Sequence, residues 1–251
     1  MSTLTGVNKQ ITSFAPPARR LMGPGPSDIH PRVMAALSRP TIGHLDPEFV
    51  RMMDEVKELT QYAFQTTNRL SMVVSAPGSA GMETAFVNLV EPGEKVIVCR
   101  NGVFGGRMLE NVLRCGGVPV IVDDAWGQPV DPEKVQAAFS SHPDAKILAF
   151  VHAETSTGVR SDAETLCQMA REHGALSIAD TVTSLAGIPV LTDEWGIDAA
   201  YSGSQKCLSC VPGLSPVTLS PAAVEKVQSR KTKVQSWFLD LNLVMQYWGD
   251  G

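Results

Sequence analysis

Three stretches of this sequence combine residue types that could do chemistry, and each follows a short apolar run typical of a buried strand. Residues 75–81 (Ser-Ala-Pro-Gly-Ser-Ala-Gly) are small, so their backbone amides could approach an anion at the start of a helix. Asp180 directly follows the run 176–179, where a carboxylate needs hydrogen-bond donors or a cation. Lys206 follows the run 198–201, and burial lowers the pKa of a lysine and makes its amine nucleophilic toward aldehydes.

Each stretch also has an ordinary structural interpretation. Residues 75–81 match neither the dinucleotide-binding nor the P-loop pattern and can form a plain strand-to-helix turn, and Asp180 can be a helix N-cap. The segment 152–158 (His-Ala-Glu-Thr-Ser-Thr-Gly) can equally line a pocket or form a turn. The combination is more informative than its members, because an anion cradle, a carboxylate and a lysine at three strand ends are what pyridoxal phosphate requires. The cradle takes the phosphate, the carboxylate keeps the pyridine nitrogen protonated, and the lysine forms a Schiff base.

The elements that position these residues are predicted by apolar runs that alternate with helix-like segments. Runs rich in Val and Ile indicate strands buried on both faces, and the alternation implies a mostly parallel sheet. Strands are expected within residues 72–74, 95–98, 118–122, 146–151, 175–179, 198–201 and 215–219. Helices are expected near residue 31, after residue 47, within 81–90, 106–114, 132–139 and 163–173, from 221, and within 238–248. We therefore expect an α/β protein, an α/β/α sandwich whose ligands bind at the carboxyl edge of the sheet.

The composition excludes several classes of protein. The chain has 251 residues, 43% of them hydrophobic, and its 21 basic and 26 acidic residues give a net charge of −5. This composition supports a sizeable core and lacks the basic surface of a nucleic-acid-binding protein. No apolar run approaches 18 residues, and the first nine residues do not have the pattern of a signal peptide. We expect no membrane or nucleic-acid partner.

Five scattered cysteines indicate a reducing, cytoplasmic compartment rather than a disulfide framework. Cys207 and Cys210 form a C-x-x-C pair without a second ligand pair at zinc spacing, and the five histidines do not have ligand spacing. No metal site is therefore expected. His44 and His152 could approach the pocket, although a structural or surface role fits them better.

Several motifs, in the same order along the chain, resemble the class V, fold-type I pyridoxal-phosphate-dependent aminotransferases, closest to the alanine–glyoxylate and serine–pyruvate aminotransferase group. They are Leu21–Pro26, Glu154–Gly158, Tyr201–Lys206, Ser229–Lys233 and Tyr247–Gly249. The resemblance implies an N-terminal arm at residues 1–20 and a fold-type I cofactor-binding large domain at residues 21–251. The family's C-terminal small domain, which supplies an arginine for the substrate carboxylate, has no counterpart in this chain.

The resemblance also implies roles for individual residues. Lys206 would form the Schiff base and carry the proton between Cα of the substrate and C4′ of the cofactor, and Asp180 would pair with the pyridine nitrogen. Seven further residues would hold the cofactor: Val182 beneath the ring, Phe104 stacked on it, Ser156 at its phenolic oxygen, and Gln205 with the backbone of Gly78, Ser79 and Ala80 at the phosphate.

The reaction that the resemblance implies is ping-pong transfer of an amino group from a small amino acid, alanine or serine, to glyoxylate or pyruvate. The family also implies a homodimer with active sites at its interface. Three alternatives remain open: a ureidoglycine–glyoxylate aminotransferase, a pyridoxal-phosphate-binding module without full activity, and a cysteine desulfurase-like lyase. The run Gln205–Leu208 is similar to the ureidoglycine type, whereas desulfurases typically carry histidine where Gln205 stands.

Overall fold

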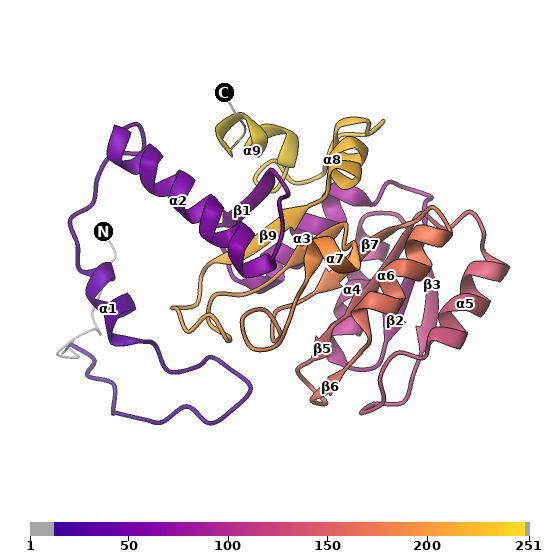
Figure 1. The fold of residues 1–251 in the computed structure, drawn as a ribbon, viewed down its shortest axis with the longest axis horizontal. Helices are drawn as coiled ribbons and strands as arrows, with labels where there is room; N and C mark the ends of the chain where they lie inside the picture. Colours follow the sequence, from indigo (N-terminus) through magenta and orange to yellow (C-terminus); the bar gives the residue numbers. More distant parts are fainter. Residues whose placement is uncertain (1–12, 249–251) are drawn as a thin grey trace, which may run out of the picture.

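The computed structural model describes residues 13–248, which are built around a seven-stranded sheet with the strand order β1-β9-β8-β7-β4-β2-β3 (Figure 1). Its strands are β1 (Leu70–Val74), β2 (Lys95–Arg100), β3 (Val118–Asp123), β4 (Ile147–Val151), β7 (Leu176–Asp180), β8 (Ala199–Tyr201) and β9 (Ser215–Leu219). Strand β9 pairs antiparallel with both of its neighbours, and every other neighbouring pair in the sheet is parallel. The mostly parallel sheet predicted from the sequence is confirmed.

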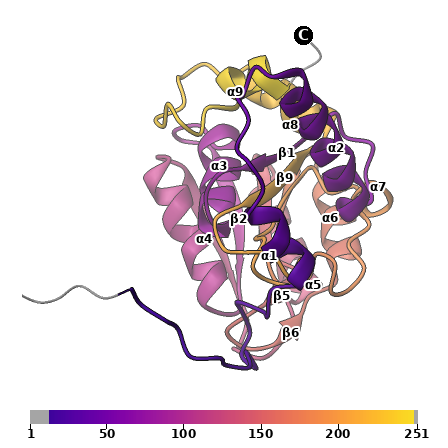
Figure 2. The ribbon, with the colours of Figure 1, turned by 90° about the vertical axis from the view of Figure 1, so that its left-hand side faces the viewer.

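Helices cover both faces of the sheet, as Figure 2 shows with the sheet between two helical layers. They are α1 (Pro31–Leu37), α2 (Pro47–Phe64), α3 (Gly78–Leu89), α4 (Val103–Arg114), α5 (Pro132–Ser141), α6 (Ala163–Glu172), α7 (Thr192–Trp195), α8 (Pro221–Gln228) and α9 (Leu241–Trp248). Helices α3, α4, α8 and α9 share one apolar cluster with the sheet, and the other cluster contains residues of α5 and α6 with the end of α2. This arrangement is the predicted α/β/α sandwich.

Side-chain alternation along the central strands builds the two apolar clusters. In β2, Val96 and Val98 join the cluster under α3 and α4, whereas Ile97 and Cys99 join the opposite cluster. Successive side chains of a strand point to opposite faces, so strands that are apolar throughout can supply both layers. The same alternation puts Asp180 on the face of Ile178, toward α3 and α4.

The helix starts follow local capping chemistry. Asp46, Asp131 and Ser220 each accept a hydrogen bond from a backbone amide in the first turn, and proline follows each of them at the first helical position. Helix α3 begins at Gly78, three residues before the predicted start, so the small residues 78–80 form its first turn. The hairpin of β5 (Ala153–Glu154) and β6 (Val159–Arg160) and the short helix α7 were not predicted from the sequence.

The segment from residue 13 to residue 46 lies mostly outside the packed body. Figures 1 and 2 show it and α1 standing away from the sheet, and nearly all of its residues are exposed. It contacts the body where the Ser27 amide donates to the carbonyl oxygen of Gln205 at 2.9 Å. The predicted arm at residues 1–20 falls mainly outside the described residues, and its described part, 13–20, has no regular secondary structure.

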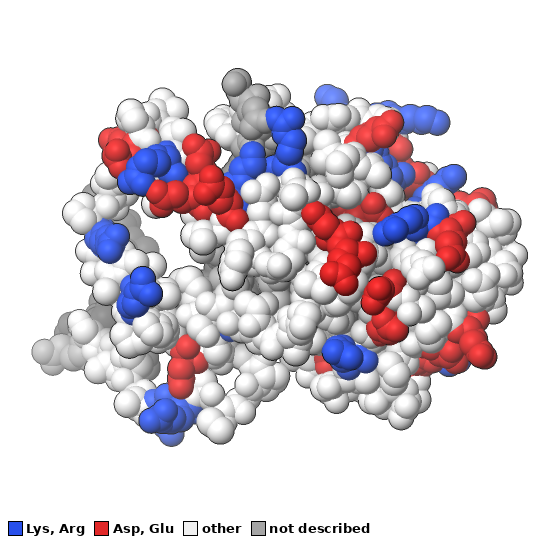
Figure 3. Space-filling view, in the orientation of Figure 1, with Lys and Arg blue, Asp and Glu red and all other residues white. Residues whose placement is uncertain are grey.

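Charged side chains of both signs are interspersed on the face shown in Figure 3. On α2, for example, Arg51 lies between Glu48 and Glu55 and pairs with both. Helices long and apolar enough to cross a membrane do not occur within residues 13–248.

Candidate active site

Asp180 ends strand β7 at the carboxyl edge of the sheet and is only 2% exposed. Its carboxylate accepts hydrogen bonds from the Val182 amide and from the Tyr201 hydroxyl, both at 2.9 Å. Burial raises the pKa of Asp180 to about 6, and the nearby Glu154 carboxylate adds to this, whereas the two hydrogen bonds and Lys206 oppose it. A buried carboxylate in this state favours a cationic ligand.

Lys206 lies in the turn after β8, half-buried beneath a loop of the N-terminal segment. Its Nζ donates to the carbonyl oxygen of Pro24 at 2.9 Å, and burial lowers the pKa of its ammonium group while Asp180 partly offsets this. A Cβ on Gly25 would lie 2.5 Å from Cδ and 2.8 Å from Nζ of Lys206, so only glycine, at φ +120°, allows this close approach. The Ser27 hydroxyl donates to the carbonyl oxygen of Lys206 at 2.7 Å and fixes the same loop.

The backbone at Gly78 meets the segment that precedes Lys206. A Cβ on Gly78 would lie 3.3 Å from Cγ2 of Val182 and 3.5 Å from Cα of Gly203, so these three residues are in close contact. Gln205 lies beside Gly203, and its Oε1 is buried without a hydrogen-bond partner among the described residues. The structure thus brings Gly78, Val182 and Gln205 together, with unused hydrogen-bonding capacity among them.

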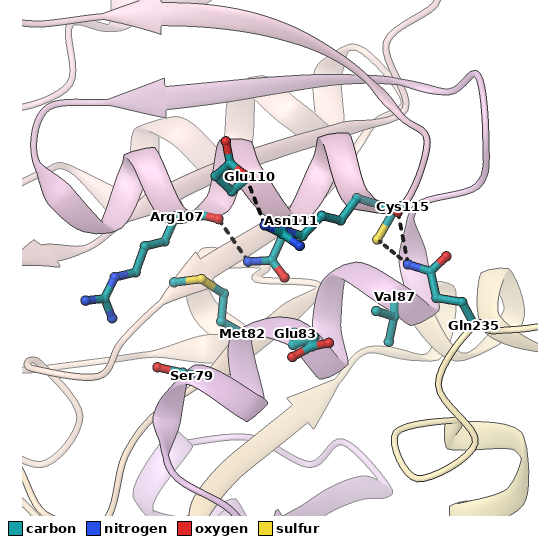
Figure 4. A pocket seen from close by; sticks show the side chains of 10 residues that line it. Ser79, Met82, Glu83, Val87, Arg107, Glu110, Asn111, Cys115 and Gln235 are labelled. Atoms are coloured by element: carbon teal, nitrogen blue, oxygen red, sulfur yellow. Dashed lines mark hydrogen bonds and ion pairs between the residues drawn. The ribbon is translucent and has the colours of Figure 1, made fainter.

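Ser79 lines a cavity of about 350 Å³ between α3 and α4 (Figure 4). Arg107 lines the same cavity, and its guanidinium carbon lies 4.6 Å from the centre of the Phe104 ring, a cation–π contact. The Ala80 amide donates to the carbonyl oxygen of Pro77 at 2.7 Å, so one of the three predicted cradle amides already has a partner. Ser79 thus lines a different cavity from Lys206, and its backbone amide remains the candidate for the cradle.

Phe104 and Ser156 are brought together by a third residue, Glu154, which is 1% exposed. One carboxylate oxygen of Glu154 accepts from the amides of Phe104 (3.1 Å) and Gly105 (3.3 Å). The other oxygen accepts from the amide (3.1 Å) and the hydroxyl (2.7 Å) of Ser156. Ser156 Oγ in turn accepts from the Val103 amide at 3.0 Å, so the first turn of α4 is capped from the segment after β4.

A cavity of about 390 Å³ contains Lys206 and lies beside these groups. It is lined by residues of the N-terminal loop, the β5–β6 hairpin and the two turns after β7 and β8: Gly23, Pro24, Gly25, Ser27, Ala153, Glu154, Thr155, Gly158, Thr183, Lys206 and Cys207. Its volume suits a small organic ligand.

Replacing Gly102 with alanine is expected to destabilise the protein by about 1–3 kcal/mol. A Cβ there would lie 2.5 Å from Cδ of Glu154 and 2.6 Å from Ser156 Oγ, both held by hydrogen bonds. Gly106, one helical turn further along, is the matched control because its added Cβ meets nothing within 4 Å. Thermal or urea unfolding should show a loss for Gly102→Ala and none for Gly106→Ala, and equal stability of the two variants would contradict the close packing at Gly102.

Sequence reasoning did not identify several residues of this site. Glu154 and Tyr201 lay within recognised motifs but received no role, and the contact of Gly25 with Lys206 was not foreseen. A tyrosine that closes an apolar strand next to small residues is the signal that could have marked Tyr201. The N-cap interpretation of Asp180 is wrong, because turns follow it and the next helix begins only at Thr192.

His152 is buried, with Nδ1 3.0 Å from Ser184 Oγ and its ring edge-on to Trp195, which is the structural role expected for it. His44 is exposed. Within residues 13–248, no group of three His, Cys, Asp or Glu side chains is arranged to hold a metal ion.

Comparison with known proteins agrees with this geometry. The family model Aminotransferase class-V matches residues 27–235. An alanine–glyoxylate aminotransferase of Drosophila melanogaster is 39% identical over 234 residues, which cover 93% of this chain and 59% of the relative. The solved alanine–glyoxylate aminotransferase of a Nostoc species has a TM-score of 0.93 at 46% identity, over 96% of this chain and 64% of that one.

The solved ureidoglycine–glyoxylate aminotransferase of Bacillus subtilis also has a TM-score of 0.93, at 33% identity, over 95% of this chain and 62% of that one. The chain therefore spans less than two thirds of the length of each of these relatives. Aminotransferases of class V with this fold, fold type I, depend on pyridoxal phosphate. With the family model matching most of its length and the fold superposing closely, this chain belongs to the class-V aminotransferase family.

Proposed function

We propose that this chain binds pyridoxal phosphate and takes part in transferring an amino group from a small amino acid, alanine or serine, to glyoxylate or pyruvate. The observation that carries the proposal is the electrostatic pairing of Asp180, a buried carboxylate with a raised pKa, with the half-buried amine of Lys206, which lines the cavity of about 390 Å³. The hydrogen bonds that the described residues donate to the Asp180 carboxylate come from an amide and a hydroxyl, both neutral. A pyridinium nitrogen would supply the missing cation.

The residues present fit the cofactor. The buried, unpartnered Oε1 of Gln205 marks an amide with hydrogen-bonding capacity left, and the bare backbone of Gly78 lies next to it. Helix α3 begins at Gly78 without a side-chain cap from Pro77, so its amino-terminal end is open to an anion. These features support a phosphate position at the start of α3.

Residues from separate elements of the fold would each contact a different part of the cofactor. Asp180 would take the pyridine nitrogen and Lys206 the reactive aldehyde. The others would be Val182 and Phe104 on the ring, Ser156 at the phenolic oxygen, and Gln205 with the backbone of Gly78, Ser79 and Ala80 at the phosphate. Arg107 already lies over the Phe104 ring, so the cofactor would stack on the opposite face of that ring.

When bound, pyridoxal phosphate supplies an aldehyde that condenses with amines and a protonated ring that accepts the electron pair released at Cα. The chain's own contribution is proton transfer and charge. Lys206 would remove the proton from Cα of the substrate and return it at C4′ of the cofactor. Proton removal requires a neutral amine, and burial favours that form by lowering the pKa of Lys206. Asp180 would keep the pyridine nitrogen of the cofactor protonated.

The amino donor and acceptor are proposed from the relatives. Alanine and glyoxylate are supported by the Drosophila and Nostoc proteins, which are alanine–glyoxylate aminotransferases. Ureidoglycine is a second candidate donor, favoured by the equal TM-score of the Bacillus subtilis ureidoglycine–glyoxylate aminotransferase. Mixing the cofactor-loaded protein with alanine, serine or ureidoglycine and following the visible absorbance in a single turnover would rank the three donors.

Borohydride reduction of protein incubated with pyridoxal phosphate is expected to attach the cofactor to Lys206. A lysine with a lowered pKa in a cavity reacts with aldehydes faster than exposed lysines such as Lys146. Peptide mass spectrometry should therefore find the adduct on the peptide that contains Lys206. An adduct without any response to amino acids would favour a cofactor-binding module, and folded protein without an adduct would contradict the proposal.

We further propose a homodimer in a cytoplasmic location. The exposed apolar side chains of the segment outside the body, among them Phe14 and Met22, support burial against a second subunit. The five cysteines are all free, which supports a reducing compartment. Light scattering on the purified protein should give about twice 26.9 kDa, and a monomer at micromolar concentration would contradict the dimer.

A further inference from the structure

Glu154 is the one strongly buried carboxylate near the site besides Asp180 among the described residues, and the proposed reaction gives it no task. It ends the two-residue strand β5 and lines the same cavity as Lys206. Its carboxylate accepts four hydrogen bonds, from the amides of Phe104 and Gly105 and from the amide and hydroxyl of Ser156. Phe104 and Ser156 are both expected to touch the cofactor ring. A charged group taken out of water in this way needs such partners, so its place is tightly defined.

The start of α4 lacks a capping side chain of its own. Gly102 occupies the N-cap position and provides no side-chain hydrogen bond, so the first amides of the helix need partners from elsewhere. The amides of Phe104 and Gly105 donate hydrogen bonds to Glu154, which lies 50 and 49 positions away in the sequence. The Val103 amide donates to Ser156 Oγ. A negative charge at this end of a helix is also favoured by the helix dipole.

We propose that Glu154 is a positioning residue that sets the distance between Phe104, on the face of the cofactor ring, and Ser156, at its phenolic oxygen. One carboxylate oxygen holds the backbone of Phe104 and the other holds the amide and hydroxyl of Ser156. The inference rests on the proposed function, because it assigns both held residues to pyridoxal phosphate.

The geometry also defines what the Ser156 hydroxyl has left for a ligand, which is its second lone pair. Its hydroxyl donates to Glu154 at 2.7 Å and accepts from the Val103 amide at 3.0 Å, so both its proton and one lone pair are in use. The Ser156 oxygen is thereby oriented by two partners rather than free to rotate. A change at Glu154 therefore alters what Ser156 presents to a ligand, without touching the ligand itself.

The test is Glu154→Gln, which keeps the size of the side chain but replaces one acceptor oxygen with a donor NH2 group. We expect the variant to raise the Kd for pyridoxal phosphate by about 10-fold or more, because hydrogen bonds to a charged group are lost at two cofactor contacts. The visible circular dichroism of the bound cofactor should also change, because Phe104 and Ser156 are no longer held at a fixed distance from each other. Glu164→Gln, an exposed glutamate in the first turn of α6, is the matched control and should change neither readout.

A double-mutant cycle with Ser156→Ala separates positioning from general stability. If Glu154 acts through Ser156, the change in binding free energy in the double mutant should be smaller than the sum of the changes caused by Glu154→Gln and Ser156→Ala alone. Hydrogen exchange of the cofactor-free protein gives an independent readout, since the Phe104 and Gly105 amides should exchange faster in Glu154→Gln. If that variant does not fold, Glu154→Asp replaces it, because a shorter carboxylate keeps the charge but cannot reach both partners.

The outcomes distinguish this inference from the proposed function. Wild-type protein that does not bind pyridoxal phosphate refutes the proposed function and the role of Glu154 with it. Wild-type binding together with an unchanged Kd and dichroism in folded Glu154→Gln overturns the positioning role alone, as does full additivity in the cycle.

Discussion

Replacing Lys206 with alanine is expected to abolish cofactor trapping by borohydride and to reduce multiple-turnover amino transfer by about 10⁴-fold or more, at the upper end of what one acid–base group contributes. The reason is that Lys206 has two proposed tasks, covalent attachment of the cofactor and proton transfer at Cα. The alanine variant loses both, because the other residues lining its cavity include no second lysine. Mass spectrometry of the reduced protein and a coupled assay for the keto acid product would measure the two effects.

The fold should survive this substitution. Lys206 is half-buried, and its side chain contributes one hydrogen bond, to the carbonyl oxygen of Pro24, and packing against Gly25. Thermal unfolding should confirm that the variant is folded, while Lys146→Ala, at an exposed position before β4, controls for the loss of a lysine. Undiminished turnover in Lys206→Ala would refute the proposed role of this residue.

Replacing Asp180 with asparagine is expected to lower the rate of amino transfer by about 100-fold or more, by removing a fixed charge from the reacting ring. Asparagine keeps the shape of the side chain and can still accept from the Val182 amide and bond to the Tyr201 hydroxyl. Only the negative charge is lost, so the protonated pyridine nitrogen is no longer stabilised. Single-turnover kinetics with alanine would measure the change, and Asp54→Asn, at an exposed position of α2, is the control.

The same substitution should have the opposite effect on the stability of the cofactor-free protein. The pKa of Asp180 rises from an ordinary 3.8 to about 6 on folding, so the folded state binds this proton more tightly than the unfolded chain. Its contribution to stability is fully present below about pH 4 and is lost as the pH rises through 6, about 3 kcal/mol in all. Asparagine does not titrate in this range.

Cofactor-free Asp180→Asn should therefore be more stable than wild type at pH 8, with the difference shrinking toward pH 4. Urea unfolding at both pH values would test this prediction. A variant that is less stable than wild type at pH 8, or equally active in amino transfer, would contradict the role of Asp180 as a charge kept for a cationic partner.

The sequence by itself determined most of the elements of this fold, apart from the β5–β6 hairpin and the short helix α7. Apolar runs such as Ile147–Val151 become central strands, because a strand can be buried on both faces only if its consecutive side chains are all apolar. That property can be read from the local sequence. Helix α2 begins where Asp46-Pro47 requires, because an N-cap and a first-position proline act within one turn. The strand-end positions of Asp180 and Lys206, and hence the class of chemistry, follow from the same local information.

Only the tertiary structure decided how those elements meet. Strand β9 lies antiparallel between β1 and β8, and no local pattern specifies a pairing partner so distant in the chain. The contact of Lys206 with Pro24 spans 182 positions, and that of Glu154 with Phe104 spans 50. Such contacts form because buried amides, carboxylates and amines must find partners after the chain has packed, so the residues that complete this site are defined by the whole fold.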